Sequence, residues 1–92
     1  MLQAHWENIP RLELVEKLLA PWGQVARLGP NSLRYIPDDD RYPAFYFHAN
    51  GWIDILAASA DLFYRADCLE ALQKWTGGRL TQGLDNRIGV ID

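Results

Sequence analysis

The sequence predicts a single α+β domain in which a small antiparallel meander sheet of three to four strands packs against two helices. The predicted order is roughly α-β-β-β-β-α. Three observations support this class: an amphipathic segment that ends at Pro21, a series of β-rich segments separated by turn residues, and a second apolar helical segment before Gly77-Gly78.

Length and composition limit the classes of protein that fit. The 92 residues correspond to one domain over residues 1–92, and an apolar content of 49% is sufficient for a hydrophobic core. A net charge of −3 offers no basic excess for phosphates, so we expect no nucleic-acid partner. The single cysteine, and the lack of a signal-peptide pattern or a long uncharged apolar run, favour a cytoplasmic protein without membrane contact.

The first predicted helix runs from about Pro10 to Ala20. Proline suits the first helical turn, where its missing N–H group has no intrahelical partner in any case. Apolar side chains then recur at helical spacing: Leu12, Val15, Leu18 and Leu19. Short strands are predicted over residues 24–28 and 33–36, around the turn residues 29–32. Residues 37–43 form a loop between two prolines.

Asn50-Gly51 predicts a hairpin between strands over residues 44–49 and 52–57. A two-residue type I′ turn would place Ala49 opposite Trp52 and Phe47 opposite Asp54. In that register both faces of the hairpin are largely apolar. Their combined apolar area is larger than two short helices would cover. Either the tail, the amino-terminal segment or loop residues cover the second face, or the sheet curls, or that face meets another protein or a second copy of the chain. A small-molecule cavity between sheet and helices is the remaining alternative.

The second half of the chain predicts a turn over residues 58–61, a short strand over 62–64 and a helix from about Cys68 to Thr76. Asp67 is the predicted N-cap of that helix and Gly77-Gly78 its end. The course of residues 79–92 stays open, with an edge strand over 87–91 as one alternative.

The sequence contains no recognisable catalytic or metal-binding motif. Its two histidines, His5 and His48, are not at ligand spacing, so we expect no metal and no cofactor. Cys68, at the predicted start of a helix, lies where the helix dipole favours a thiolate, but a buried structural cysteine is the simpler interpretation.

We therefore expect a non-enzymatic protein-protein interaction domain, such as a small regulator or inhibitor of the phage or mobile-element type. Its partner would be another protein or a second copy of the chain, bound through a sheet face and an acidic loop. The predicted contact residues are Asp38, Asp39, Asp40, Tyr42, Tyr46, His48, Trp52 and Tyr64. The alternative is a small enzyme or ligand-binding domain that uses Cys68 and His48 or a core pocket.

Overall fold

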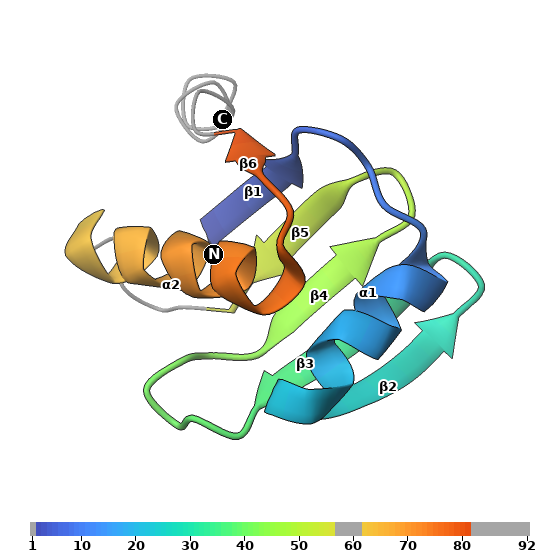
Figure 1. Ribbon diagram of the computed structural model, residues 1–92, viewed down its shortest axis with the longest axis horizontal. Helices are drawn as coiled ribbons and strands as arrows, with labels where there is room; N and C mark the ends of the chain where they lie inside the picture. Colours follow the sequence, from blue (N-terminus) through green and yellow to red (C-terminus); the bar gives the residue numbers. More distant parts are fainter. Residues whose placement is uncertain (1, 57–61, 82–92) are drawn as a thin grey trace.

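The computed structural model describes residues 2–56 and 62–81, and these form an α+β fold with an antiparallel sheet (Figure 1). The sheet has six strands in the order β2-β3-β4-β5-β1-β6. The elements, in chain order, are β1 (Leu2–Trp6), α1 (Leu12–Leu19), β2 (Gly23–Gly29), β3 (Ser32–Pro37), β4 (Phe45–His48), β5 (Trp52–Ile55), α2 (Leu62–Thr76) and β6 (Leu80–Thr81).

The predicted class and the meander are confirmed, because β2, β3, β4 and β5 are neighbours in both sequence and sheet. The sheet is larger than predicted because β1 and β6 extend it beyond β5. Strand β1 was not predicted, although its burial alternates in the manner of a strand with one covered face. Leu2, Ala4 and Trp6 face the core, while Gln3 and His5 point to the other side.

Helices α1 and α2 both pack on the same face of the sheet, which we call the inner face (Figure 1). Helix α1 is confirmed and continues into a single 3-10 turn over Ala20–Trp22. Its buried side chains join those of α2 and the strands in one core. The helical members of that core are Leu12, Val15, Leu19, Cys68, Leu69 and Leu72.

Helix α2 begins earlier than predicted. The strand expected over residues 62–64 is wrong, because α2 starts at Leu62, and Asp67 consequently lies within the helix rather than at its N-cap. The β propensity of Leu-Phe-Tyr is a weak preference that a continuing helix overrides. The predicted end is confirmed: Gly77 has φ +74° and its N–H donates to the Gln73 carbonyl at 2.8 Å. The predicted turn over 58–61 and edge strand over 87–91 lie outside the described residues.

The β4–β5 hairpin is confirmed, but its predicted register is wrong by one residue. Phe47 pairs with Ile53, and Tyr46 pairs with Asp54. The connection is a three-residue loop in which only Gly51 has positive φ, at +96°, and its N–H donates to the His48 carbonyl at 3.0 Å. A type I′ turn would need positive φ at Asn50 as well.

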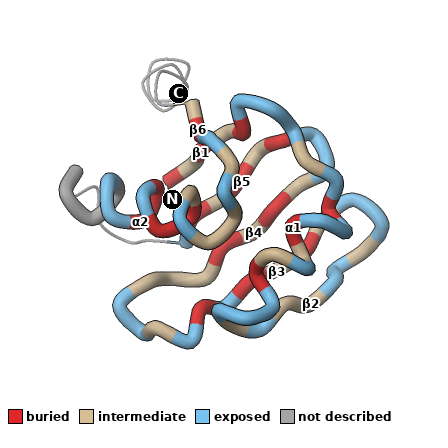
Figure 2. The backbone as a smooth tube through the Cα atoms, in the orientation of Figure 1, coloured by how far each residue is buried: buried red, intermediate tan, exposed pale blue. Residues whose placement is uncertain are grey.

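This shift changes which side chains share a face, because neighbouring residues of a strand point in opposite directions. The inner face carries side chains with no exposed area, namely Phe45, Phe47, Ile53 and Ile55. The outer face carries half-buried ones, namely Tyr46, His48, Trp52 and Asp54. The predicted hairpin with two apolar faces is therefore wrong: one face is core, as the buried positions along β4 and β5 in Figure 2 show, and the other is mixed polar and aromatic.

Candidate functional site

The residues predicted to contact a partner fall on two separate surfaces. Those on the outer face of the sheet are Tyr46, His48 and Trp52. Those on the helix side line a groove and are Asp38, Asp39 and Tyr42. Asp40 is exposed and does not line that groove. Tyr64 belongs to α2 by its backbone, and its side chain lies outside the described part of the structure.

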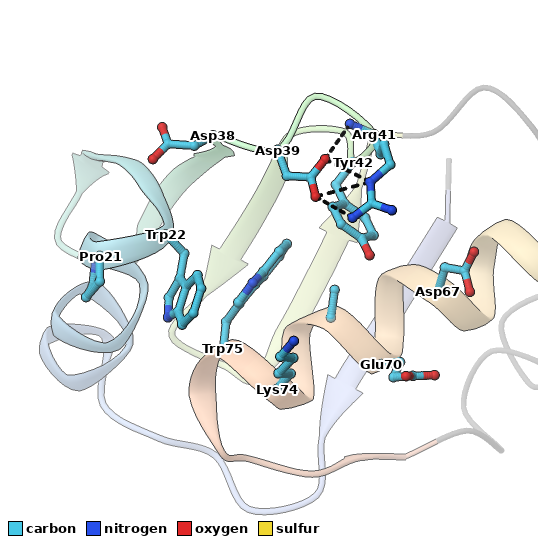
Figure 3. Close-up of a pocket in the computed structure, with 11 residues that line it drawn as sticks. Pro21, Trp22, Asp38, Asp39, Arg41, Tyr42, Asp67, Glu70, Lys74 and Trp75 are labelled. Atoms are coloured by element: carbon cyan, nitrogen blue, oxygen red, sulfur yellow. Dashed lines mark hydrogen bonds and ion pairs between the residues drawn. The ribbon is translucent and has the colours of Figure 1, made fainter.

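The groove lies between the 38–43 loop and α2, with the turn before β2 at one end (Figure 3). Its volume is about 390 Å³. We call it the acidic–aromatic groove after its side chains. The aromatic members are Trp22, Tyr42 and Trp75, the carboxylates are Asp38, Asp39, Asp67 and Glu70, and the cations are Arg41 and Lys74; Pro21 and Ala71 complete the lining.

Backbone hydrogen bonds shape the loop side of the groove. The N–H of Asp38 donates to the carbonyl of Trp22 at 2.9 Å, which joins the start of the loop to the turn before β2. The N–H of Tyr42 donates to the carbonyl of Asp39 at 3.2 Å and closes a tight turn. The loop is thereby held at both its start and its centre.

An ion pair stiffens the same loop. The guanidinium of Arg41 donates from Nε and from the terminal nitrogen to the carboxylate of Asp39, the shorter bond being 2.7 Å (Figure 3). These hydrogen bonds lower the pKa of Asp39 and raise that of Arg41. The guanidinium also lies 5.6 Å from the ring centroid of Tyr42. The groove rim thus binds one cation of its own chain through a carboxylate and an aromatic ring.

The aromatic wall is held by the core beneath it. Trp75 makes edge contacts with Tyr42 at 5.2 Å, with Tyr35 at 5.7 Å and with Phe45 at 6.3 Å between ring centroids. Trp22 is 45% exposed, so its ring presents apolar surface to solvent beside the groove. Positioned aromatic rings of this kind are favourable contact surfaces for a cation or for an apolar side-chain stem.

Helix α2 supplies the other rim. Asp67, Glu70 and Lys74 are spaced three and four residues apart and therefore lie along one side of the helix. This contribution was not predicted, because Asp67 was expected to be the N-cap of the helix. The helical spacing of these charged residues could have placed them on one side of the helix. No local pattern in the sequence indicates that this side lies beside the distant 38–43 loop.

The outer face carries a hydrogen-bonded network centred on Asp54. Its Oδ1 accepts a hydrogen bond from the amide of Gln3 at 2.8 Å, and its Oδ2 lies 2.9 Å from Nε2 of His48. Beside it, the ring of His5 contacts Trp52 edge to face at 4.9 Å. The network joins β1, β4 and β5 and orients the polar groups of this face.

Ser32 lies opposite His48 in the β3–β4 pairing, so a hydroxyl, an imidazole and a carboxylate follow one another across three strands. Nucleophilic catalysis requires contact between hydroxyl and imidazole. Among the described residues, Ser32 makes no side-chain hydrogen bond to His48. His48 and Asp54 thus belong to a polar network on the sheet surface that Ser32 does not join within the described part of the chain.

Cys68 lies within α2 with no exposed area, as the simpler interpretation predicted. Because α2 begins at Leu62, Cys68 is not at the start of the helix, where the helix dipole would favour a thiolate. Across residues 2–56 and 62–81, no group of three or more His, Cys, Asp or Glu side chains is arranged to hold a metal ion.

No protein-family model, no curated protein and no solved structure matches this chain. Within the described segments, neither helix has the length and apolar character needed to cross a membrane.

Proposed function

We propose that this chain is a non-enzymatic protein-binding domain, and that its acidic–aromatic groove receives a basic segment of a partner protein. The observation that carries the proposal is the composition of the groove. Its lining has four carboxylates and three aromatic rings, against two cations. Because Arg41 already neutralises Asp39, the charge offered to a partner comes from Asp38, Asp67 and Glu70, with Lys74 as the one opposing group in the lining.

The chemistry of Arg and Lys side chains fits this lining. Their alkyl stems pack on aromatic rings, while their charged ends bind carboxylates. The contact of Arg41 with Asp39 and the Tyr42 ring is an example within the chain itself. A volume of about 390 Å³ accommodates one or two such side chains of an extended segment rather than a whole folded element.

The test uses octa-arginine and octa-lysine peptides as probes, with octa-glutamate as the negative probe, and follows tryptophan fluorescence and titration calorimetry. We expect the cationic peptides to bind and the affinity to fall as salt is raised. Replacing two rim carboxylates, Asp67→Asn with Glu70→Gln, should weaken binding by roughly tenfold, and Trp22→Ala by roughly fivefold.

The matched control removes two carboxylates outside the groove, Asp40→Asn with Glu7→Gln, both exposed. It changes the net charge equally and should leave affinity within about twofold of wild type, because it leaves the contact intact. Equal weakening in both double variants would reduce the effect to general charge attraction and refute the groove as the site, as would failure of both cationic peptides to bind at low salt.

A further inference from the structure

The outer face of the sheet is a second surface, separate from the groove. Helices α1 and α2 both pack on the inner face, so neither of them covers this side (Figure 1). Its central side chains Arg34, Tyr46 and Asp54 are each neither buried nor fully exposed. Tyr46 and Trp52 both lie on this face. Tyrosine and tryptophan are favoured at the centres of protein interfaces.

The charges on this face follow a simple order. Arg34 pairs with Tyr46 across β3 and β4, and Tyr46 pairs with Asp54 across β4 and β5. Adjacent strands are about 4.8 Å apart, so Arg34 and Asp54 are about 10 Å apart on opposite sides of Tyr46. Within the segments that the structure describes, no carboxylate pairs with Arg34, and its Nε is buried without a hydrogen-bond partner.

We infer that this face binds a second copy of the chain, with the twofold axis parallel to the strands and passing over Tyr46. Rotation about that axis exchanges the two sides of β4. Arg34 of one copy then lies against Asp54 of the other, and the pair occurs twice because the interface is symmetric. Tyr46 meets its own counterpart at the centre.

The charge order selects this axis over the alternative. A twofold axis perpendicular to the strands would set Arg34 against Arg34 and Asp54 against Asp54, which is repulsive at both places. Packed sheets rotate by about 30° relative to each other. Because Arg34 lies only about 5 Å from the axis, that rotation displaces it by about 2.5 Å, within the reach of its long side chain.

The size of the face indicates a weak dimer. With the axis over β4, the five strands from β2 to β1 overlap between the two copies. They span about 19 Å, and five residues span about 17 Å, which gives roughly 320 Å² of sheet plane per copy. The total over both copies is below the roughly 1,200 Å² at which stable specific interfaces begin, so association should be weak and depend on concentration over roughly 10 μM to 1 mM. The inference does not depend on the groove, since the two surfaces share no residue.

The test is sedimentation equilibrium over that concentration range, with the full chain. Arg34→Glu alone and Asp54→Arg alone should each weaken self-association at least tenfold, because each creates two like-charge contacts. An equimolar mixture of the two variants should associate within about threefold of wild type, because each introduced charge then faces an opposite one. Arg11→Glu, on the helix side and exposed, is the control and should associate like wild type.

Circular dichroism and thermal unfolding establish that each variant is folded. The wild type offers a second test without any substitution. On dilution, the amide and indole NMR signals of Tyr46, Trp52 and their neighbours should shift, while the signals of the groove residues stay constant. A strict monomer up to 1 mM would overturn the inference, whether the face is then solvated or covered by residues 82–92 of its own chain. A mixture no tighter than either variant alone would overturn it as well.

Discussion

His48 and Asp54 contact each other across the β4–β5 hairpin, with 2.9 Å between the imidazole Nε2 and a carboxylate oxygen. The contact exists because the loop has three residues, which sets Asp54 on the same face as His48. With a two-residue loop the carboxylate would point into the core instead. The same one-residue difference directs Ile53 inward and turns the outer face into a polar and aromatic surface.

The energetic coupling of this pair should be small. The side chains of His48 and Asp54 are 36% and 23% exposed, and solvent weakens such pairs. A double-mutant cycle with His48→Ala and Asp54→Asn, measured by urea unfolding, should give a coupling free energy below about 1 kcal/mol. A coupling above about 2 kcal/mol would mean that the pair is buried, contrary to an uncovered outer face.

The register itself can be tested at two neighbouring residues. Ile53 has no exposed area, so Ile53→Ala should lower the free energy of unfolding by about 2–5 kcal/mol. Trp52→Ala, one residue away, removes a larger side chain from the half-exposed face and should cost less than Ile53→Ala. The reverse ranking in denaturant unfolding would contradict the observed register.

Gly51 is the glycine on which the three-residue loop depends. Its φ is +96°, and an added Cβ would lie 2.7 Å from Ile9 and 2.8 Å from His5. Gly51→Ala should therefore destabilise the protein by more than about 1 kcal/mol. Gly29→Ala is the matched comparison, since its Cβ would meet nothing within 4 Å, and its thermal unfolding should stay close to wild type.

Tyr35 combines a buried ring with a hydroxyl that has no hydrogen-bond partner among the residues that the structure describes. Tyr35→Phe should thus leave stability at pH 7 unchanged or raise it by up to about 1 kcal/mol. Burial, with a smaller contribution from the negative charge of Asp38, raises the pKa of Tyr35. A pKa that is higher in the folded state contributes stability below the unfolded value of about 10, and this contribution is lost as the pH rises above it.

Denaturant unfolding at pH 7 and pH 11 separates the two effects. The wild type should lose more stability than Tyr35→Phe between these pH values, because only the wild type must keep a buried phenol protonated. Equal losses would show that Tyr35 ionises normally in the folded protein.

The Asp39–Arg41 pair makes a prediction at acidic pH. Hydrogen bonds from Arg41 lower the pKa of Asp39, so their stabilising effect is present above the unfolded pKa and is lost as the pH falls through the folded one. An NMR titration of the Asp39 side chain should show this lowered pKa, and Arg41→Gln should raise it toward the ordinary aspartate value. No change in that variant would mean that Arg41 does not hold the carboxylate in solution.

Local sequence patterns determined much of the fold. The apolar spacing of α1, the turn residues around β2 and β3, and the Gly77-Gly78 end of α2 act over a few residues, and each was predicted close to its observed bounds. The α+β class and the meander follow from their order. The acidic loop and Tyr42 were also identified as candidate contacts from residue types alone.

Tertiary structure decided the rest. Asn50-Gly51 is compatible with both a two- and a three-residue loop, and the shorter one would bury Asp54 while turning Ile53 and Ile55 outward. Burial of those isoleucines under the helices selects the observed register. In the same way, strand β1 depends on its pairing with β5. Asp67 lines one groove with the acidic residues of the 38–43 loop because α2 packs beside that loop. These features depend on contacts between residues far apart in the chain, so no short segment of the sequence determines them.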